Sequence, residues 1–112
     1  MGAFGGGLGG NGEVCGAVVG GIGVLGLIFS RARDEELEDL RMWTYTREFL
    51  NRFREEVAQN HPGIHCRDIV GVDWTDRAQV KAFYSGDKRL ECSRIVGETA
   101  KLIGEMIEKI KS

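Results

Sequence analysis

The apolar positions of this chain recur at helical spacing and not at the two-residue spacing of strands. Over residues 34–60, apolar side chains return every three to five residues with charged residues opposite, at Leu37, Leu40, Tyr45, Phe49, Phe53 and Val57. Residues 88–111 show the same pattern, with Cys92, Ile95, Val96, Thr99, Leu102, Ile103, Met106, Ile107 and Ile110 on one face. Such stripes predict two long amphipathic helices and an all-α fold.

Shorter segments complete the expected fold. An apolar helix is predicted over residues 13–31, a short helical turn over 66–71, and a further helix from Thr75 or Asp76 to Tyr84. The sequence His61-Pro62-Gly63 ends the long helix, because proline cannot continue it. We therefore expect a small antiparallel helical bundle in which two long amphipathic helices cover one Gly-rich apolar helix.

Glycine is concentrated at the start of the chain. Residues 1–12, MGAFGGGLGGNG, form a Gly-rich lead segment, which is flexible or tightly packed, and Asn11 or Gly12 is a candidate cap for the next helix. That helix is itself interrupted by glycines, each of which costs about 1 kcal/mol relative to alanine. Close approach of another helix or of a cofactor to the backbone would offset this cost.

Size and charge restrict the class of protein. A chain of 112 residues has the length of one domain, 1–112, and its formal net charge of −2 provides no basic face for nucleic acid. The uncharged run from Val14 to Phe29 is 16 residues long, whereas a membrane-spanning helix needs about 20. We therefore expect a core helix and no membrane span.

Three dispersed cysteines are the most informative residues. Cys15, Cys66 and Cys92 all fall near predicted helix N-termini, where a thiol pKa is lowered and the reactive thiolate is favoured. No Cys-x-x-Cys pair is present, so any joint site has to form in space. The three residues are redox candidates, with inert burial as small hydrophobic side chains as the alternative. An odd number of cysteines favours a cytoplasmic protein with reduced thiols.

Two histidines lie close to Cys66. His61 and His65 flank the Pro-Gly stop, and either could raise the thiolate character of Cys66 or complete a metal site. The candidate metal ligands are Cys15, Cys66, Cys92 and His65. The aromatic residues Trp43, Trp74, Phe83 and Tyr84 are interpreted as packing residues.

The N-terminal residues resemble a family of redox-active proteins named for its Cys…Gly-Cys-Ala-x-x-Gly…Cys…Cys arrangement. Members carry a segment similar to Phe-Gly-Gly-Gly, a Cys-Gly-Ala-x-x-Gly motif and a Leu-Gly-Leu, which correspond to Phe4–Gly7, Cys15–Gly20 and Leu25–Leu27. Phe49 and Phe53, Cys66 with Ile69, Val70 and Gly71, and Cys92 with Val96 resemble the later elements. The family's first cysteine lies on a helix before the Gly-rich stretch, and this chain shows no counterpart of it.

The resemblance implies redox activity and leaves the form of the site open. Three cysteines in one copy could form a three-cysteine site, one disulfide with a spare thiol, or a site shared between subunits. They would then exchange disulfides, transfer electrons, or bind an iron–sulfur cluster or another thiolate-bound metal. The alternative is a helical interaction or dimerisation module with structural cysteines. A homo-oligomer is expected, and the redox partner stays open.

Overall fold

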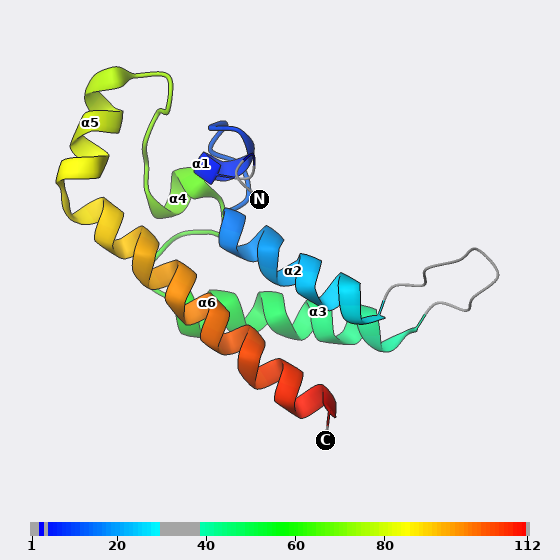
Figure 1. The fold of residues 1–112 in the computed structure, drawn as a ribbon. Helices are drawn as coiled ribbons and strands as arrows, with labels where there is room; N and C mark the ends of the chain where they lie inside the picture. Colours follow the sequence, from blue (N-terminus) through cyan, green and yellow to red (C-terminus); the bar gives the residue numbers. More distant parts are fainter. Residues whose placement is uncertain (1–2, 4, 30–38, 112) are drawn as a thin grey trace.

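The structure is a computed structural model that describes residues 3, 5–29 and 39–111 (Figure 1). It consists of helices joined by loops: α1 (Gly5–Leu8), α2 (Gly16–Phe29), α3 (Arg41–Arg52), the π-helical turn η2 (Phe53–Val57), α4 (Cys66–Ile69), α5 (Arg77–Ser85) and α6 (Asp87–Lys111). Within the described residues, β pairing is limited to one isolated antiparallel bridge between Val14 and His65. The predicted all-α fold is confirmed.

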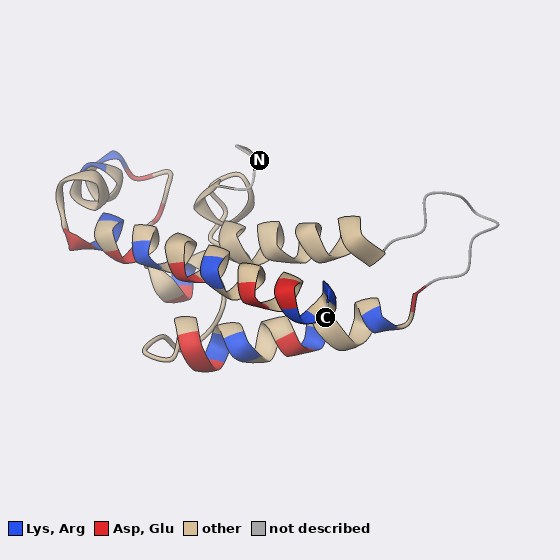
Figure 2. Cartoon of the chain, turned by 60° about the horizontal axis from the view of Figure 1, so that its bottom comes forward, with Lys and Arg blue, Asp and Glu red and all other residues tan. Residues whose placement is uncertain are grey.

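Helix α2 packs against both α3 and α6, and the core lies between them. Figure 1 shows α2 and α3 running in opposite directions, with α6 crossing them. The completely buried large side chains come from all three helices and from η2: Val18, Leu25, Phe49, Phe53, Ile95 and Met106. Charged residues are spread along α3 and α6 and are absent from α2 (Figure 2). In the described part of the chain, no helix is long and apolar enough to cross a membrane.

The long helix predicted over 34–60 is shorter than expected. Asp34 and Leu37 lie outside the described residues, and α3 begins at Arg41, after Asp39 accepts a 3.0 Å hydrogen bond from the Arg41 backbone N–H. Leu40 is 75% exposed, so its assignment to the apolar stripe was wrong. The helix widens into η2 and ends before Pro62, as the proline predicts.

The second half of the chain follows the predicted capping. The Asp76 side chain accepts hydrogen bonds from the Ala78 and Gln79 backbone N–H groups at the start of α5, and Gly86 separates α5 from α6. His61 Nε2 lies 2.7 Å from Glu91 Oε2, and Arg94 donates a 2.8 Å hydrogen bond to the Val57 carbonyl. These contacts join the end of η2 and the following loop to α6.

The Gly-rich lead segment is tightly packed. Gly6, Gly7, Gly9, Gly10 and Gly12 all have φ between +60° and +76°, a region that side chains disfavour. Backbone hydrogen bonds of 2.7–3.1 Å close the segment on itself, from Gly9 N to Ala3 O, Gly10 N to Gly5 O, Gly12 N to Gly6 O and Glu13 N to Gly7 O. The coiled segment rests on the part of the chain around α4.

The apolar helix therefore starts later than predicted. Residues 13–15 pair with the loop before α4: Cys15 N donates to Ile64 O at 2.9 Å and Cys66 N donates to Glu13 O at 2.6 Å. This pairing holds the backbone extended until Gly16, where α2 begins. Asn11 does not cap the helix, because its side-chain amide donates to the Leu8 carbonyl at 2.9 Å.

Candidate functional site

Each cysteine is placed by a different element. Cys15 immediately precedes α2, and its carbonyl accepts the first helical hydrogen bonds from Val18 and Val19. Cys66 is the first residue of α4. Cys92 lies in the second turn of α6, close to its predicted place early in that helix. All three are free thiols in the structure.

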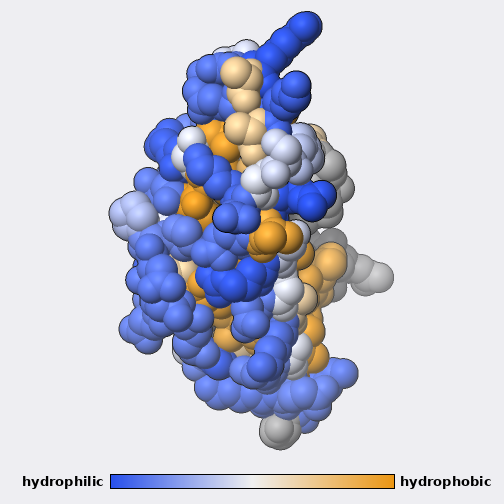
Figure 3. All heavy atoms as spheres, turned by 90° about the vertical axis from the view of Figure 1, so that its left-hand side faces the viewer, coloured by the Kyte–Doolittle hydropathy of each residue, from blue (hydrophilic) through white to orange (hydrophobic). Residues whose placement is uncertain are grey.

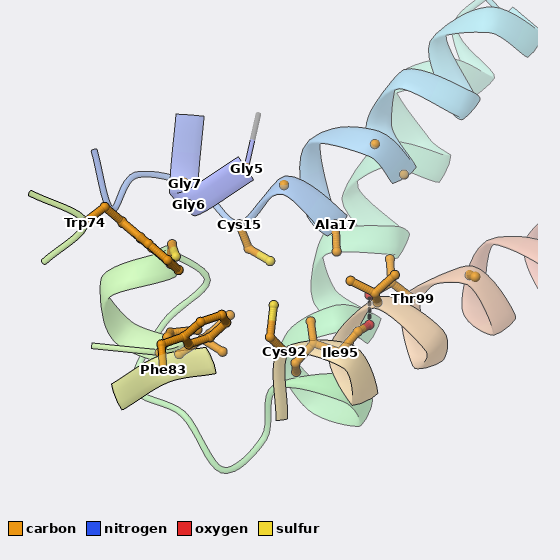
Figure 4. A pocket seen from close by; sticks show the side chains of 18 of the residues that line it. Gly5, Gly6, Gly7, Cys15, Ala17, Trp74, Phe83, Cys92, Ile95 and Thr99 are labelled. Atoms are coloured by element: carbon orange, nitrogen blue, oxygen red, sulfur yellow. Dashed lines mark hydrogen bonds between the residues drawn. The ribbon is translucent and has the colours of Figure 1, made fainter. Parts of the chain in front are cut away.

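The three cysteines line one cavity of about 670 Å³ (Figure 4). Figure 4 shows the sulfur atoms of Cys15 and Cys92 facing one another across it. Cys66 is the most buried of the three, with 8% of its surface exposed, whereas Cys15 and Cys92 are half-buried. The site therefore brings together residues from the beginning, the middle and the end of the chain.

The cavity walls are almost entirely apolar. The residues of α2 that form one wall are small, apart from Val24: Gly16, Ala17, Gly20, Gly21 and Val24. The wall from α6 consists of Cys92, Ile95, Val96, Thr99, Ala100 and Ile103. The Thr99 hydroxyl is satisfied within α6, since it donates to the Ile95 carbonyl at 2.6 Å.

Aromatic side chains form one end of the cavity. Trp74 and Phe83 meet edge to face with ring centroids 5.0 Å apart, and Phe83 meets Tyr84 in the same way at 5.1 Å. Tyr84 and Val96 are 60% and 54% exposed, so the cavity opens to solvent beside them. Hydrophobic surface is visible between hydrophilic residues on the face shown in Figure 3.

The Gly-rich segment closes the cavity near Cys66. A Cβ at Gly7 would lie 2.6 Å from the Cβ of Cys66, and one at Gly6 would lie 3.1 Å from Nε1 of Trp74. A side chain at position 6 would therefore crowd Trp74, and one at position 7 would collide with Cys66, so glycine is the residue that fits at both positions. Trp74 Nε1 is buried and has no partner of hydrogen-bond geometry in the part of the chain that the structure describes.

The electrostatics differ from the sequence expectation. Burial raises the pKa of the Cys66 thiol; the nearby Trp74 indole N–H opposes this shift in part, and the neighbouring Cys15 adds to it. Burial also raises the pKa of Cys92, and the proximity of Cys15 and Cys66 reinforces the increase. The prediction that helix N-termini lower these thiol pKa values was thus wrong for Cys66 and Cys92, because desolvation of the thiolate dominates.

The four candidate metal ligands do not form a metal site in this arrangement. His65 does not line the cavity, and its Nδ1 lies 3.4 Å from Asp68 Oδ2 at the start of α4. Among the described residues, no three His, Cys, Asp or Glu side chains lie together as a metal ion would require. An iron–sulfur cluster needs still more thiolates, so the residues described do not fit one.

Sequence reasoning found the cysteines but missed the rest of the site. Trp74, Phe83 and Tyr84 were interpreted as packing residues, and they do pack on one another, but all three also line the cavity. Val96, Ala100 and Ile103 are further lining residues, on the α6 face that bears Cys92. Their position on the same helix face as Cys92 could have predicted that they line the site. Nothing in the local sequence indicates that Trp74, Phe83 and Tyr84 lie at the end of the cavity.

Comparison with known proteins shows the family of the chain. No curated protein and no solved structure matches the chain. A family model described as "Putative redox-active protein (C_GCAxxG_C_C)" matches residues 1–106 and therefore includes all three cysteines and their cavity. The chain belongs to this C_GCAxxG_C_C family.

Proposed function

We propose that this protein is a dithiol redox protein in which Cys15 and Cys92 interconvert between two thiols and one disulfide. The observation that carries the proposal is that three cysteines from distant segments line one apolar cavity. Inert cysteines would be expected to lie separately in the core. Convergence on an open cavity instead provides thiols that a reactant can reach.

The pair is chosen on geometry. The sulfurs of Cys15 and Cys92 face each other, and both residues are partly exposed. Cys15 also immediately precedes the 14-residue helix α2. Joining the two sulfurs releases two electrons and two protons to an acceptor. Cys66 is the spare thiol, buried beneath the Gly-rich segment.

Thiol–disulfide chemistry is favoured over metal binding for the same site. Among the described residues, no three His, Cys, Asp or Glu side chains lie together as a metal ion would require, whereas a disulfide needs only two thiols. We further propose that the protein acts in the cytoplasm, where free thiols are maintained. The homo-oligomer expected from the sequence remains part of the proposal, to be measured by native mass spectrometry.

The test is oxidation of the purified protein with diamide without oxygen, followed by intact-mass analysis and peptide mapping. We expect one intramolecular disulfide, seen as a loss of two hydrogens, or about 2 Da. Cys15→Ser and Cys92→Ser should each abolish it, and Cys66→Ser should retain it. If the wild-type protein forms no intramolecular disulfide, the proposal is wrong and the helical interaction module becomes the better interpretation.

A further inference from the structure

We propose that the electron acceptor for this dithiol is an uncharged, apolar, planar molecule of quinone type that enters the cysteine cavity. The inference rests on the dithiol function proposed above and adds the chemical class of the oxidant. Three properties of the cavity carry it: the absence of charge on its walls, its size, and its shape.

The uncharged walls of the cavity disfavour the binding of charged oxidants. Of the described residues that line it, none is Lys, Arg, His, Asp or Glu. An ionised group placed there would lose its hydration without gaining a partner, which is costly. Glutathione disulfide carries several carboxylates and ammonium groups, whereas a quinone carries only two carbonyl oxygens.

Size and shape agree with a ring compound. A cavity of about 670 Å³ lies within the range of small-molecule sites. The glycines of α2 leave a wall without large side chains, so that a flat ring can approach the backbone. Ile95 and Ile103 form the facing apolar wall, and the Trp74–Phe83 pair provides aromatic surface at one end.

The reaction balances with the quinone as the oxidant. The Cys15 and Cys92 S–H bonds break, one S–S bond forms, and two electrons with two protons reduce the two quinone carbonyls to hydroxyls. The products are the disulfide and the hydroquinone.

The experiment compares oxidants of the same protein without oxygen. Duroquinone is the probe, because its four ring methyl groups leave no ring C–H position for addition of a thiol. The rate of disulfide formation in the protein is measured with duroquinone and with glutathione disulfide. Each rate is divided by the rate at which the same oxidant reacts with free dithiothreitol. We expect the normalised rate to be at least about tenfold higher for duroquinone, since the charged oxidant pays the cost of desolvation. An equal or higher value for glutathione disulfide overturns the proposal.

A charge placed at the cavity provides the second measurement. Ala100 is an exposed residue of α6 that lines the cavity, so Ala100→Glu adds a carboxylate there without disturbing the core. Gly104→Glu adds the same charge to the same helix at a position with open space. In each variant, the rate of oxidation by duroquinone is divided by the rate of oxidation by diamide. We expect this ratio to fall about tenfold in Ala100→Glu and to stay unchanged in Gly104→Glu. An unchanged ratio in Ala100→Glu places the reaction outside the cavity and overturns the proposal.

Binding itself can be followed in the Trp43→Phe variant, whose remaining indole, Trp74, lines the cavity. Duroquinone should quench its fluorescence to saturation, and Ala100→Glu in that background should weaken the quenching.

If instead the wild-type protein is a dimer that Ala100→Glu dissociates, the cavity is an interface between copies and the quinone proposal is wrong. Failure of diamide to form the disulfide would refute the dithiol function itself, so the two failures are distinguishable.

Discussion

The glycines of the N-terminal segment and those of α2 have different structural roles. In residues 5–12, Gly6, Gly7 and Gly10 have positive φ and coil the backbone back on itself over Trp74 and Cys66. In α2 the backbone is helical, and Gly21 instead provides space for the Phe49 ring of α3. The first region uses the conformational freedom of glycine, and the second uses its lack of a side chain.

The difference shows why so costly a helix is retained. A helix with several interior glycines is intrinsically unfavourable. Close packing of Gly21 against the completely buried Phe49 offsets part of that cost, whereas Gly16 and Gly20 line the cavity. Substitutions that add one methyl group can separate the two roles.

The largest effect is expected for Gly7→Ala. The new Cβ would lie 2.6 Å from the Glu13 backbone and from the Cβ of Cys66, at a φ of +70°. Backbone strain and overpacking together should lower the free energy of unfolding by roughly 3–5 kcal/mol in urea denaturation. Gly5→Ala is the matched control, because its Cβ meets nothing within 4 Å. Equal stabilities of the two variants would contradict the packed segment.

A smaller loss is expected for Gly21→Ala. Its Cβ would collide with the Phe49 ring, which is buried between α2 and α3 and cannot easily move. The gain in helix propensity offsets part of the cost, so we expect a loss of about 1–3 kcal/mol. Phe49→Leu in the same background should recover part of it. A gain in stability from Gly21→Ala alone would show that α3 does not pack as described.

Gly23→Ala should act in the opposite direction. Gly23 is exposed on α2 and a Cβ there meets nothing within 4 Å, so only the backbone preference changes. We expect an increase of about 0.5–1 kcal/mol in the free energy of unfolding, measured by the same denaturation. A loss comparable to that of Gly21→Ala would mean that space around α2 is limited on all sides.

The last prediction concerns how ionisation of the buried Cys66 and Cys92 thiols changes folding stability, an effect that is smallest at neutral pH. Their pKa values are raised in the folded protein, so at neutral pH both the folded and the unfolded chain keep these protons and no stability is lost. As the pH rises through the ordinary thiol range, the unfolded chain loses its protons first and folding stability falls. Urea titrations in reducing buffer should show this fall, and Cys66→Ser should diminish it. A flat profile would contradict the burial of the thiols.

Local signals predicted much of the fold. The apolar spacing located α3 and α6, Pro62 marked the end of the long helix, and Asp76 caps α5 as its position suggested. The start of α2 was predicted three residues too early, because pairing of residues 13–15 with the loop before α4 holds that backbone extended. Such pairing joins residues 13–15 to residues 64–66, which are far apart in the sequence, and leaves no local mark.

The sequence by itself determined the helical class, most helix ends, the three thiols and the family resemblance. Each of these follows from residue type and spacing along the chain. Only the tertiary structure decided that the thiols share an apolar cavity, that His65 pairs with Asp68 outside it, and that Cys66 and Cys92 have raised pKa values. The physical reason is that burial and convergence depend on how distant helices pack, and burial disfavours the charged thiolate.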